Sequence, residues 1–230
     1  MGGCGGVLLS SDTVLTAAHC KKYRNGEVAL GEYNLKEKKG TEQVIGIRDW
    51  INHPDWDRMP KGSTNDFAII KLVSHVSFSL HILPVCLPSI SKNYDDVIAT
   101  VSGFGRTTCN GNFEDELQKV TIKTVKCEET DHDPSHITPN MLCAALPGKH
   151  ASAGDSGGPL VTEEGGYFSV IGVVSWGYQC KQPTKELPGV YARVTSQLDW
   201  ISGRAANDPS RKFYNQGKGS HLRHYAKKGA

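Results

Sequence analysis

Short runs of β-branched and apolar residues recur along the chain, and clusters of turn residues separate them. Strands of about five residues at this spacing, with hardly any long 3.6-residue period, are typical of an all-β sandwich or a pair of barrels. The predicted strands are residues 6–9, 13–17, 28–30, 43–48, 67–72, 99–101, 117–125, 158–161, 169–174 and 189–194. The pattern therefore predicts an all-β fold.

A helical period appears near the end of this pattern. Residues 196–206 place Leu198, Ile201 and Ala205 at helical intervals, and Ser196 precedes them as a candidate N-cap. We therefore expect a C-terminal α-helix.

The length and composition narrow the class of protein. A chain of 230 residues suits one large all-β domain or two small ones. With 38% hydrophobic residues and a net charge of +2, a wholly disordered chain is excluded. The longest uncharged apolar runs also fall far short of the roughly 18 residues that span a bilayer. We therefore expect no membrane span and no nucleic-acid partner.

The composition changes after Ala206. Residues 203–230 hold seven Lys or Arg against a single acidic residue, without any periodicity. We expect a domain at 1–206, followed at 207–230 by a basic, solvated and disordered extension. An arm that docks on a polyanion or a membrane surface is the alternative.

The cysteines indicate an oxidising compartment. Seven cysteines at irregular spacing, with no CxxC pair, argue against a zinc ribbon or a thioredoxin motif and favour disulfides in a secreted protein. The odd count leaves at least one thiol unpaired within the chain. Since the first residues lack the basic head and apolar stretch of a secretory signal, either the chain is cytosolic or its start is missing.

The strongest chemical signal is the string GDSGGP at residues 154–159. Glycines on both sides of Ser156 permit backbone angles that other residues avoid, so the N–H groups of Gly154 and Ser156 can converge beside the hydroxyl. Such a convergence forms an oxyanion hole. An ordinary glycine-rich turn is the alternative interpretation.

A serine hydroxyl needs a base at hydrogen-bond distance, and the base needs a carboxylate to orient it. His19 lies among small residues and beside Cys20, which could anchor the turn. Asp66 opens an apolar strand that would leave it half buried. A surface or core histidine and a turn role for Asp66 remain the alternatives when each residue is taken alone.

Together these fragments resemble the trypsin-like serine proteases, which have the chymotrypsin fold. The matching strings are CGG at 4–6, LTAAHC at 15–20, NDFAIIKL at 65–72, PVCLP at 84–88, GDSGGP at 154–159, SWG at 175–177 and PGVY at 188–191. The resemblance implies two six-stranded antiparallel β-barrels with an active site in the cleft between them. The first barrel is expected to lack its N-terminal strand, because only three residues precede Cys4.

The resemblance also implies a role for each matched residue. Ser156 would attack the scissile carbonyl, His19 would take and return the proton, and Asp66 would fix the imidazole tautomer. The segment Ser175, Trp176 and Gly177 would pair with the substrate backbone. The disulfides implied by the resemblance are Cys4 with Cys20 and Cys127 with Cys143.

Activation is the first point at which the chain departs from the family. In that family a new N-terminal ammonium inserts beside the aspartate that precedes the serine, here Asp155. Without that amine Asp155 would have no partner, so we expect a zymogen-like or weakly active chain whose complete form is secreted as a zymogen. Cys86 would then tether a light chain or pro-segment.

The specificity pocket is the second departure. The resemblance places His150 at the pocket floor, where an aspartate would select Arg or Lys, and places Gly177 and Gly189 in its walls. We therefore expect a pocket that does not favour basic side chains. Whether it favours acidic or aromatic side chains depends on the protonation of His150.

The third departure is a cysteine pair that has lost one member. Ser152 stands where the resemblance predicts a cysteine, while Cys180 remains and Cys109 has no assigned partner. A disulfide between Cys109 and Cys180 is one interpretation, and two free thiols are the other.

The leading hypothesis is a serine endopeptidase that uses neither a cofactor nor a metal. The alternative is a non-catalytic serine protease homologue that acts as a binding or regulatory module.

Overall fold

The computed structural model describes residues 3–59, 62–108, 111–146, 151–177 and 187–205. His150, Cys109, Cys180 and the extension at 207–230 lie outside these ranges, so the predictions made for them remain predictions.

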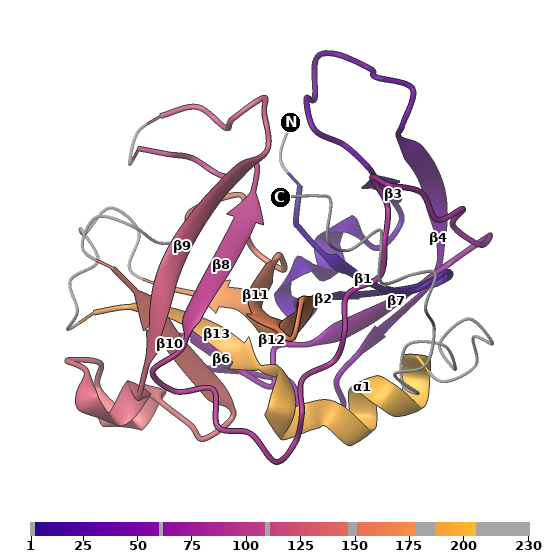
Figure 1. Ribbon diagram of the computed structural model, residues 1–230. Helices are drawn as coiled ribbons and strands as arrows, with labels where there is room; N and C mark the ends of the chain where they lie inside the picture. Colours follow the sequence, from indigo (N-terminus) through magenta and orange to yellow (C-terminus); the bar gives the residue numbers. More distant parts are fainter. Residues whose placement is uncertain (1–2, 60–61, 109–110, 147–150, 178–186, 206–230) are drawn as a thin grey trace.

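The first half of the chain forms an open antiparallel sheet of five strands. Its strand order is β1 (Val7–Ser10), β2 (Thr13–Thr16), β7 (Ala68–Leu72), β4 (Gln43–Asn52) and β3 (Glu27–Leu30). The sheet curls on the right of Figure 1. The count of five agrees with the prediction of a first unit with one strand fewer than six, and the sheet is a curled half-barrel that does not close.

The second half forms the predicted closed barrel of six antiparallel strands, on the left of Figure 1. Its order is β10 (Met141–Ala145), β13 (Gly189–Arg193), β12 (Tyr167–Trp176), β11 (Pro159–Glu164), β8 (Ile98–Gly103) and β9 (Gln118–Val125).

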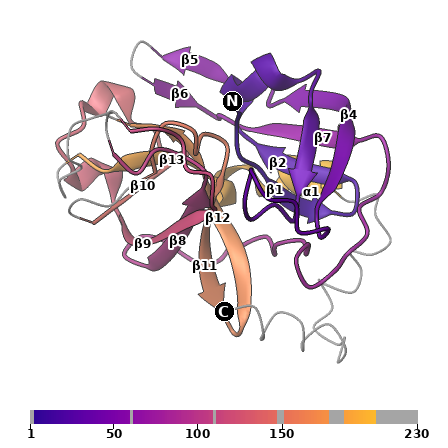
Figure 2. The same cartoon turned by 90° about the horizontal axis from the view of Figure 1, so that it is seen from above.

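Three short strands were not predicted from the sequence. β10 has the sequence MLCAA, which is buried along its whole length and so shows no alternation of polar and apolar residues. β5 (Asp57–Met59) and β6 (Gly62–Thr64) form a largely polar two-stranded hairpin, which Figure 2 shows at the edge of the molecule. Neither pattern carries the signal by which a strand is recognised.

The helices are few and short. They are the 3₁₀ turns η1 (Ala18–Tyr23), η2 (Cys127–Glu129), η3 (Pro134–His136) and η4 (Val194–Gln197), and the helix α1 (Leu198–Ala205). Ser196 does not cap α1 as predicted, because it lies inside η4 and its hydroxyl donates to the Arg193 carbonyl at 2.7 Å. None of the described helices has the length and apolar character that crossing a membrane requires.

One apolar core joins the two halves of the molecule. Leu15 of β2, Phe67 just before β7, Val170 and Val173 of β12, and Ile201 of α1 pack in a single buried cluster. β12 also sends Ile171 and Val174 into the core of the closed barrel. Because both faces of β12 are buried, its end is held rigidly, and the pocket described below begins there.

Two disulfides support the elements around the site. Cys4 is bonded to Cys20, and Cys127 is bonded to Cys143, as the resemblance implied. The first joins the segment before β1 to η1, and the second joins η2 to β10.

Candidate active site

The loop that carries Ser156 precedes β11 and takes its shape from two glycines. Gly154 has φ +103° and Gly157 has φ +78°, a region in which other residues are strained. The Gly5 N–H donates to the Ser156 carbonyl at 2.8 Å, and the Gly157 N–H donates to the Val174 carbonyl at 2.9 Å. The loop is therefore fixed to both halves of the molecule.

The carboxylate of Asp155 is bound by backbone N–H groups of two neighbouring segments. Its Oδ1 accepts the Gly105 N–H at 2.9 Å, and its Oδ2 accepts the Ser152 N–H at 2.8 Å. The expectation that Asp155 has no partner is therefore wrong. Backbone N–H groups of two neighbouring segments provide the donors that were expected from a terminal amine.

Replacing Gly105 with alanine is expected to displace Asp155. A Cβ at Gly105 would lie 2.5 Å from Asp155 Cγ, which is closer than real carbon atoms approach. We expect the free energy of unfolding to fall by about 1–3 kcal/mol, as in other overpacked sites. Urea denaturation measures this change.

The matched control for that substitution is Gly203→Ala in α1, where an added Cβ would meet no atom within 4 Å. Alanine there is expected to raise the free energy of unfolding by about 0.5–1 kcal/mol, since a helical glycine loses more backbone entropy. Equal effects at the two positions would contradict the role given to Gly105.

His19 and Asp66 form a close pair between η1 and the start of β7. Asp66 Oδ2 lies 2.7 Å from His19 Nδ1, and Asp66 Oδ1 accepts the backbone N–H of His19 at 2.9 Å. The Asp66 side chain is completely buried, whereas that of His19 is 22% exposed. Cys20, the residue after His19 in η1, is bonded to Cys4, so the disulfide anchors η1 next to the histidine.

A third donor reaches the same carboxylate. The hydroxyl of Ser175, near the end of β12, donates to Asp66 Oδ2 at 2.6 Å. We predicted Ser175 for the substrate backbone and did not predict its bond to Asp66. The two residues are 109 positions apart, and no local pattern in the sequence links them.

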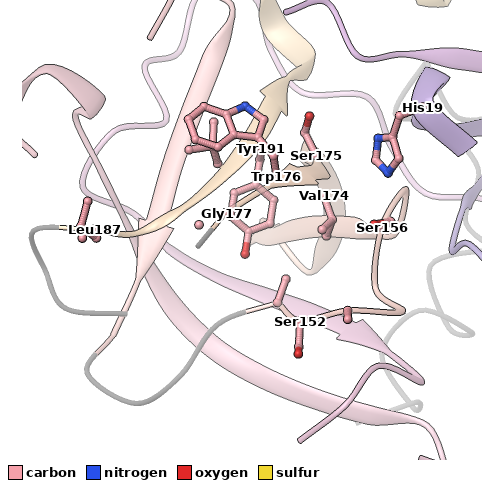
Figure 3. Close-up of a pocket in the computed structure, with 13 residues that line it drawn as sticks. His19, Ser152, Ser156, Val174, Ser175, Trp176, Gly177, Leu187 and Tyr191 are labelled. Atoms are coloured by element: carbon pink, nitrogen blue, oxygen red, sulfur yellow. The ribbon is translucent and has the colours of Figure 1, made fainter. Parts of the chain in front are cut away.

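These bonds determine which imidazole nitrogen can accept a proton. Because Asp66 is an acceptor when ionised, His19 Nδ1 carries the hydrogen, and Nε2 is left as an acceptor in the neutral ring. Figure 3 shows the imidazole above Ser156, and both residues line the same pocket. The nitrogen that can accept a proton is therefore the one that Asp66 does not bind.

The backbone donors beside Ser156 are available to a ligand. Within the part of the chain that the structure describes, neither the Gly154 N–H nor the Ser156 N–H donates to a protein acceptor. This arrangement is compatible with the oxyanion hole predicted at Gly154 and Ser156.

The pocket has a volume of about 330 Å³ and opens beside Ser156 (Figure 3). Its described lining comprises His19, Ala151, Ser152, Ala153, Ser156, Val174, Ser175, Trp176, Gly177, Leu187, Gly189, Val190 and Tyr191. Gly177 and Gly189 do line it as predicted, and a Cβ at Gly177 would lie 3.6 Å from Gly189 Cα. These glycines leave space between the two walls.

The sequence alone did not single out several of these lining residues. Ala151, Leu187 and Tyr191 face the pocket, although the sequence predicted only glycines and His150 for it. The Tyr191 side chain is buried, and burial raises the pKa of its phenol, so the hydroxyl stays protonated. Among the described lining residues none is acidic.

Trp176 forms one side of the pocket and is supported from two directions. Gly62 of β6 lies directly against its indole ring, and His132 meets it edge-on with ring centroids 5.4 Å apart. His132 Nε2 is also 2.9 Å from the Pro188 carbonyl, just before β13. Burial lowers the pKa of His132, so a neutral imidazole donates this bond.

The comparisons with known proteins agree with this geometry. The family model described as Trypsin matches residues 1–201. The chain belongs to the trypsin family. Trypsin-1 from Astacus astacus is 34% identical over 88% of this chain and 87% of its own, and Trypsin-1 from Salmo salar is 37% identical over 89% and 81%.

A longer protein is also similar. Urokinase-type plasminogen activator from Gallus gallus is 35% identical over 91% of this chain, but the match covers only 53% of that protein. Family membership supports assignment of this chain to the serine proteases, a class of hydrolases.

A metal ion does not fit this site in its oxidised form. Cys4, His19 and Cys20 come close enough together to hold an ion. However, Cys4 and Cys20 are bonded to each other, so neither sulfur is a free thiolate.

Proposed function

We propose that the chain is a serine endopeptidase in which Ser156 is the nucleophile, His19 the base and Asp66 the orienting acid. The observation that carries the proposal is the hydrogen-bonded pair of His19 and the fully buried Asp66 beside a pocket that Ser156 also lines.

In the proposed reaction Ser156 Oγ forms a bond to the scissile carbonyl carbon while His19 Nε2 takes the hydroxyl proton. The carbonyl oxygen becomes an oxyanion that the Gly154 and Ser156 N–H groups bind. His19 then gives the proton to the leaving amine as the C–N bond breaks, which leaves an acyl-enzyme. His19 then takes a proton from water, whose oxygen attacks the ester carbonyl. As the bond from the acyl carbon to Ser156 Oγ breaks, His19 returns this proton to Oγ, which releases the acid product and restores the Ser156 hydroxyl.

The segment from Ser175 to Gly177 would bind the substrate backbone as an added strand. It borders the pocket at the end of β12. A substrate strand here would bring its scissile bond beside Ser156 and one side chain into the pocket.

For that side chain we propose a preference other than Arg or Lys. A buried cation needs a carboxylate, and the described lining supplies none, since Asp155 is not part of it and accepts the backbone N–H groups of Gly105 and Ser152. His150 at the floor would add no negative charge. The choice between acidic and aromatic side chains depends on the protonation of His150. A peptide-library profile recorded at two pH values measures this preference.

Narrowing the pocket at Gly177 is expected to separate substrates by size. In Gly177→Val the added methyl groups would project toward Gly189, whose Cα is 3.6 Å from the site of a Cβ. We expect kcat/KM for a peptide with an aromatic residue at the cleavage site to fall about 100-fold, and that for an alanine peptide to change far less. Equal losses for both peptides would contradict the pocket assignment.

The test of the proposed function is labelling by a fluorophosphonate probe, followed by peptide mapping. We expect the probe on Ser156 and on no other serine, with no label in Ser156→Ala. The probe should also be applied to a folded chain that carries any upstream segment belonging to it. If that chain stays unlabelled, the result would support the alternative of a non-catalytic serine protease homologue.

Three further proposals concern the whole protein. The two disulfides fit an oxidising compartment, so we propose that the protein is secreted. Cys86 is the free cysteine among the described residues, and we propose it as the tether for a partner segment. We also propose the domain boundary near residue 206, with the basic extension after it.

A further inference from the structure

Asn65, the residue directly before Asp66, adopts an unusual backbone conformation. Its φ is +50°, in the left-handed region that a non-glycine residue occupies at a cost. The Phe67 N–H donates to the Asn65 carbonyl at 2.7 Å, so Asp66 lies at the apex of a tight three-residue turn. The direction of the Asp66 side chain therefore depends on how Asn65 is held.

All polar atoms of the Asn65 side chain are engaged. Its Nδ2 donates to the Asp55 carbonyl at 3.1 Å. Its Oδ1 accepts two amides at 2.9 Å, from Asn140 before β10 and from Gln197 before α1. A single side chain thus joins the first sheet, the closed barrel and the C-terminal segment.

Gln197 is itself oriented by a histidine. The Asp55 N–H donates to His53 Nδ1 at 3.1 Å, so in the neutral ring the hydrogen lies on Nε2 and points to Gln197 Oε1, 2.9 Å away. Burial lowers the pKa of His53, which keeps this ring neutral. With Oε1 turned to His53, the amide group of Gln197 faces Asn65.

The other side of the turn is also fixed. His53 is buried, its backbone N–H donates to the Phe67 carbonyl at 2.8 Å, and its ring packs on Trp200 with centroids 4.7 Å apart. Asp66 is thus bracketed by Asn65 and Phe67, each bound to a neighbour outside the turn.

We propose that Gln197, together with Asn65, is a positioning element for Asp66: the Gln197 amide holds Asn65 in its left-handed conformation and so directs the Asp66 carboxylate toward His19. This inference rests on the proposed function, since it assigns an activity-related role to residues that do not touch substrate. The proposal explains why Asn65, next to Asp66, is kept in a strained backbone conformation. The contacts of Asp66 with His19 and Ser175 do not explain this strain.

The deciding variant is Gln197→Glu, which has the same shape. Its carboxylate still accepts the His53 Nε2–H but cannot donate to Asn65 Oδ1. We expect kcat to fall roughly tenfold to a hundredfold, as a misplaced catalytic group produces, while KM stays within about twofold. The matched control is Gln118→Glu, the same change in an exposed residue at the start of β9, which is expected to leave both constants unchanged.

A second variant guards against a general effect of the added charge or of misfolding. Gln197→Met also removes the bond to Asn65 but introduces no charge, and it is expected to reproduce the loss in kcat. Circular dichroism and thermal unfolding identify a variant that has not folded.

The second measurement is the ¹H NMR signal of the proton between His19 Nδ1 and Asp66 Oδ2. We expect this signal to shift or broaden in both Gln197 variants and not in Gln118→Glu. Either kcat or the signal staying at its wild-type value in the folded Gln197 variants would overturn the proposal. The NMR comparison needs no turnover, so it decides this inference even if the probe leaves Ser156 unlabelled and the proposed function fails.

Discussion

Replacing Ser156 with alanine is expected to lower kcat of the active enzyme about a million-fold, because it removes the hydroxyl that we propose as the nucleophile. The backbone of the loop should keep its shape, since the Ser156 carbonyl bond to Gly5 and the bonds of Gly157 and Asp155 do not use the hydroxyl. Active-site binding should therefore survive.

The measurement is kcat on a chromogenic peptide, together with the dissociation constant of the same peptide. We expect the dissociation constant to change little, because the pocket walls are intact in the variant. Residual turnover above about one part in a thousand would show that another group serves as nucleophile.

Asp66→Asn is expected to lower kcat by about ten-thousand-fold, the size of loss that the same change causes in another serine protease. Three donors converge on the Asp66 carboxylate: the His19 backbone N–H, His19 Nδ1 and the Ser175 hydroxyl. An amide offers one oxygen and an NH₂ group, so at least one of these donors would meet an N–H. Because the His19 backbone N–H cannot become an acceptor, the amide oxygen would take the Oδ1 position and the NH₂ group would face His19 Nδ1. The imidazole would then adopt the other tautomer, with its hydrogen on Nε2.

The control for this variant is Asp199→Asn, the same change in an exposed residue of α1, which is expected to leave kcat unchanged. Thermal unfolding should be measured together with kcat, because the buried Asp66 also binds Ser175 and so links the two halves of the molecule. A folded Asp66→Asn protein with wild-type turnover would contradict the assignment of Asp66.

Much of the fold could be predicted from short strings of residues. β7 and β12 are rich in apolar and β-branched residues. Such a composition predicts a buried strand without knowledge of its neighbours. β10 was missed for the opposite reason, since Met-Leu-Cys-Ala-Ala has no alternation and becomes a strand only between its neighbours β9 and β13. Pairing with these neighbours in the folded barrel, and not the local sequence, makes β10 a strand.

The candidate site divides in the same way. His19, Asp66 and Ser156 could be named because each stands in a local string, and the structure brings His19 to Asp66 within 2.7 Å. The expectation that Asp155 has no partner was wrong because one of its donors, Gly105, lies 50 positions away in a different loop. Nothing in the residues around Asp155 indicates which backbone N–H groups will face it.

The sequence by itself determined the all-β class, the candidate catalytic residues and the family to which the chain belongs. These depend on residue types and on contacts over short distances along the chain. Only the tertiary structure decided that Ser175 supports Asp66, that Tyr191 lines the pocket, and that Gln197 lies between His53, 144 positions away, and Asn65. Hydrogen bonds between such distant residues form only when the fold brings the residues together. The residue types on either side of each position do not indicate these partners.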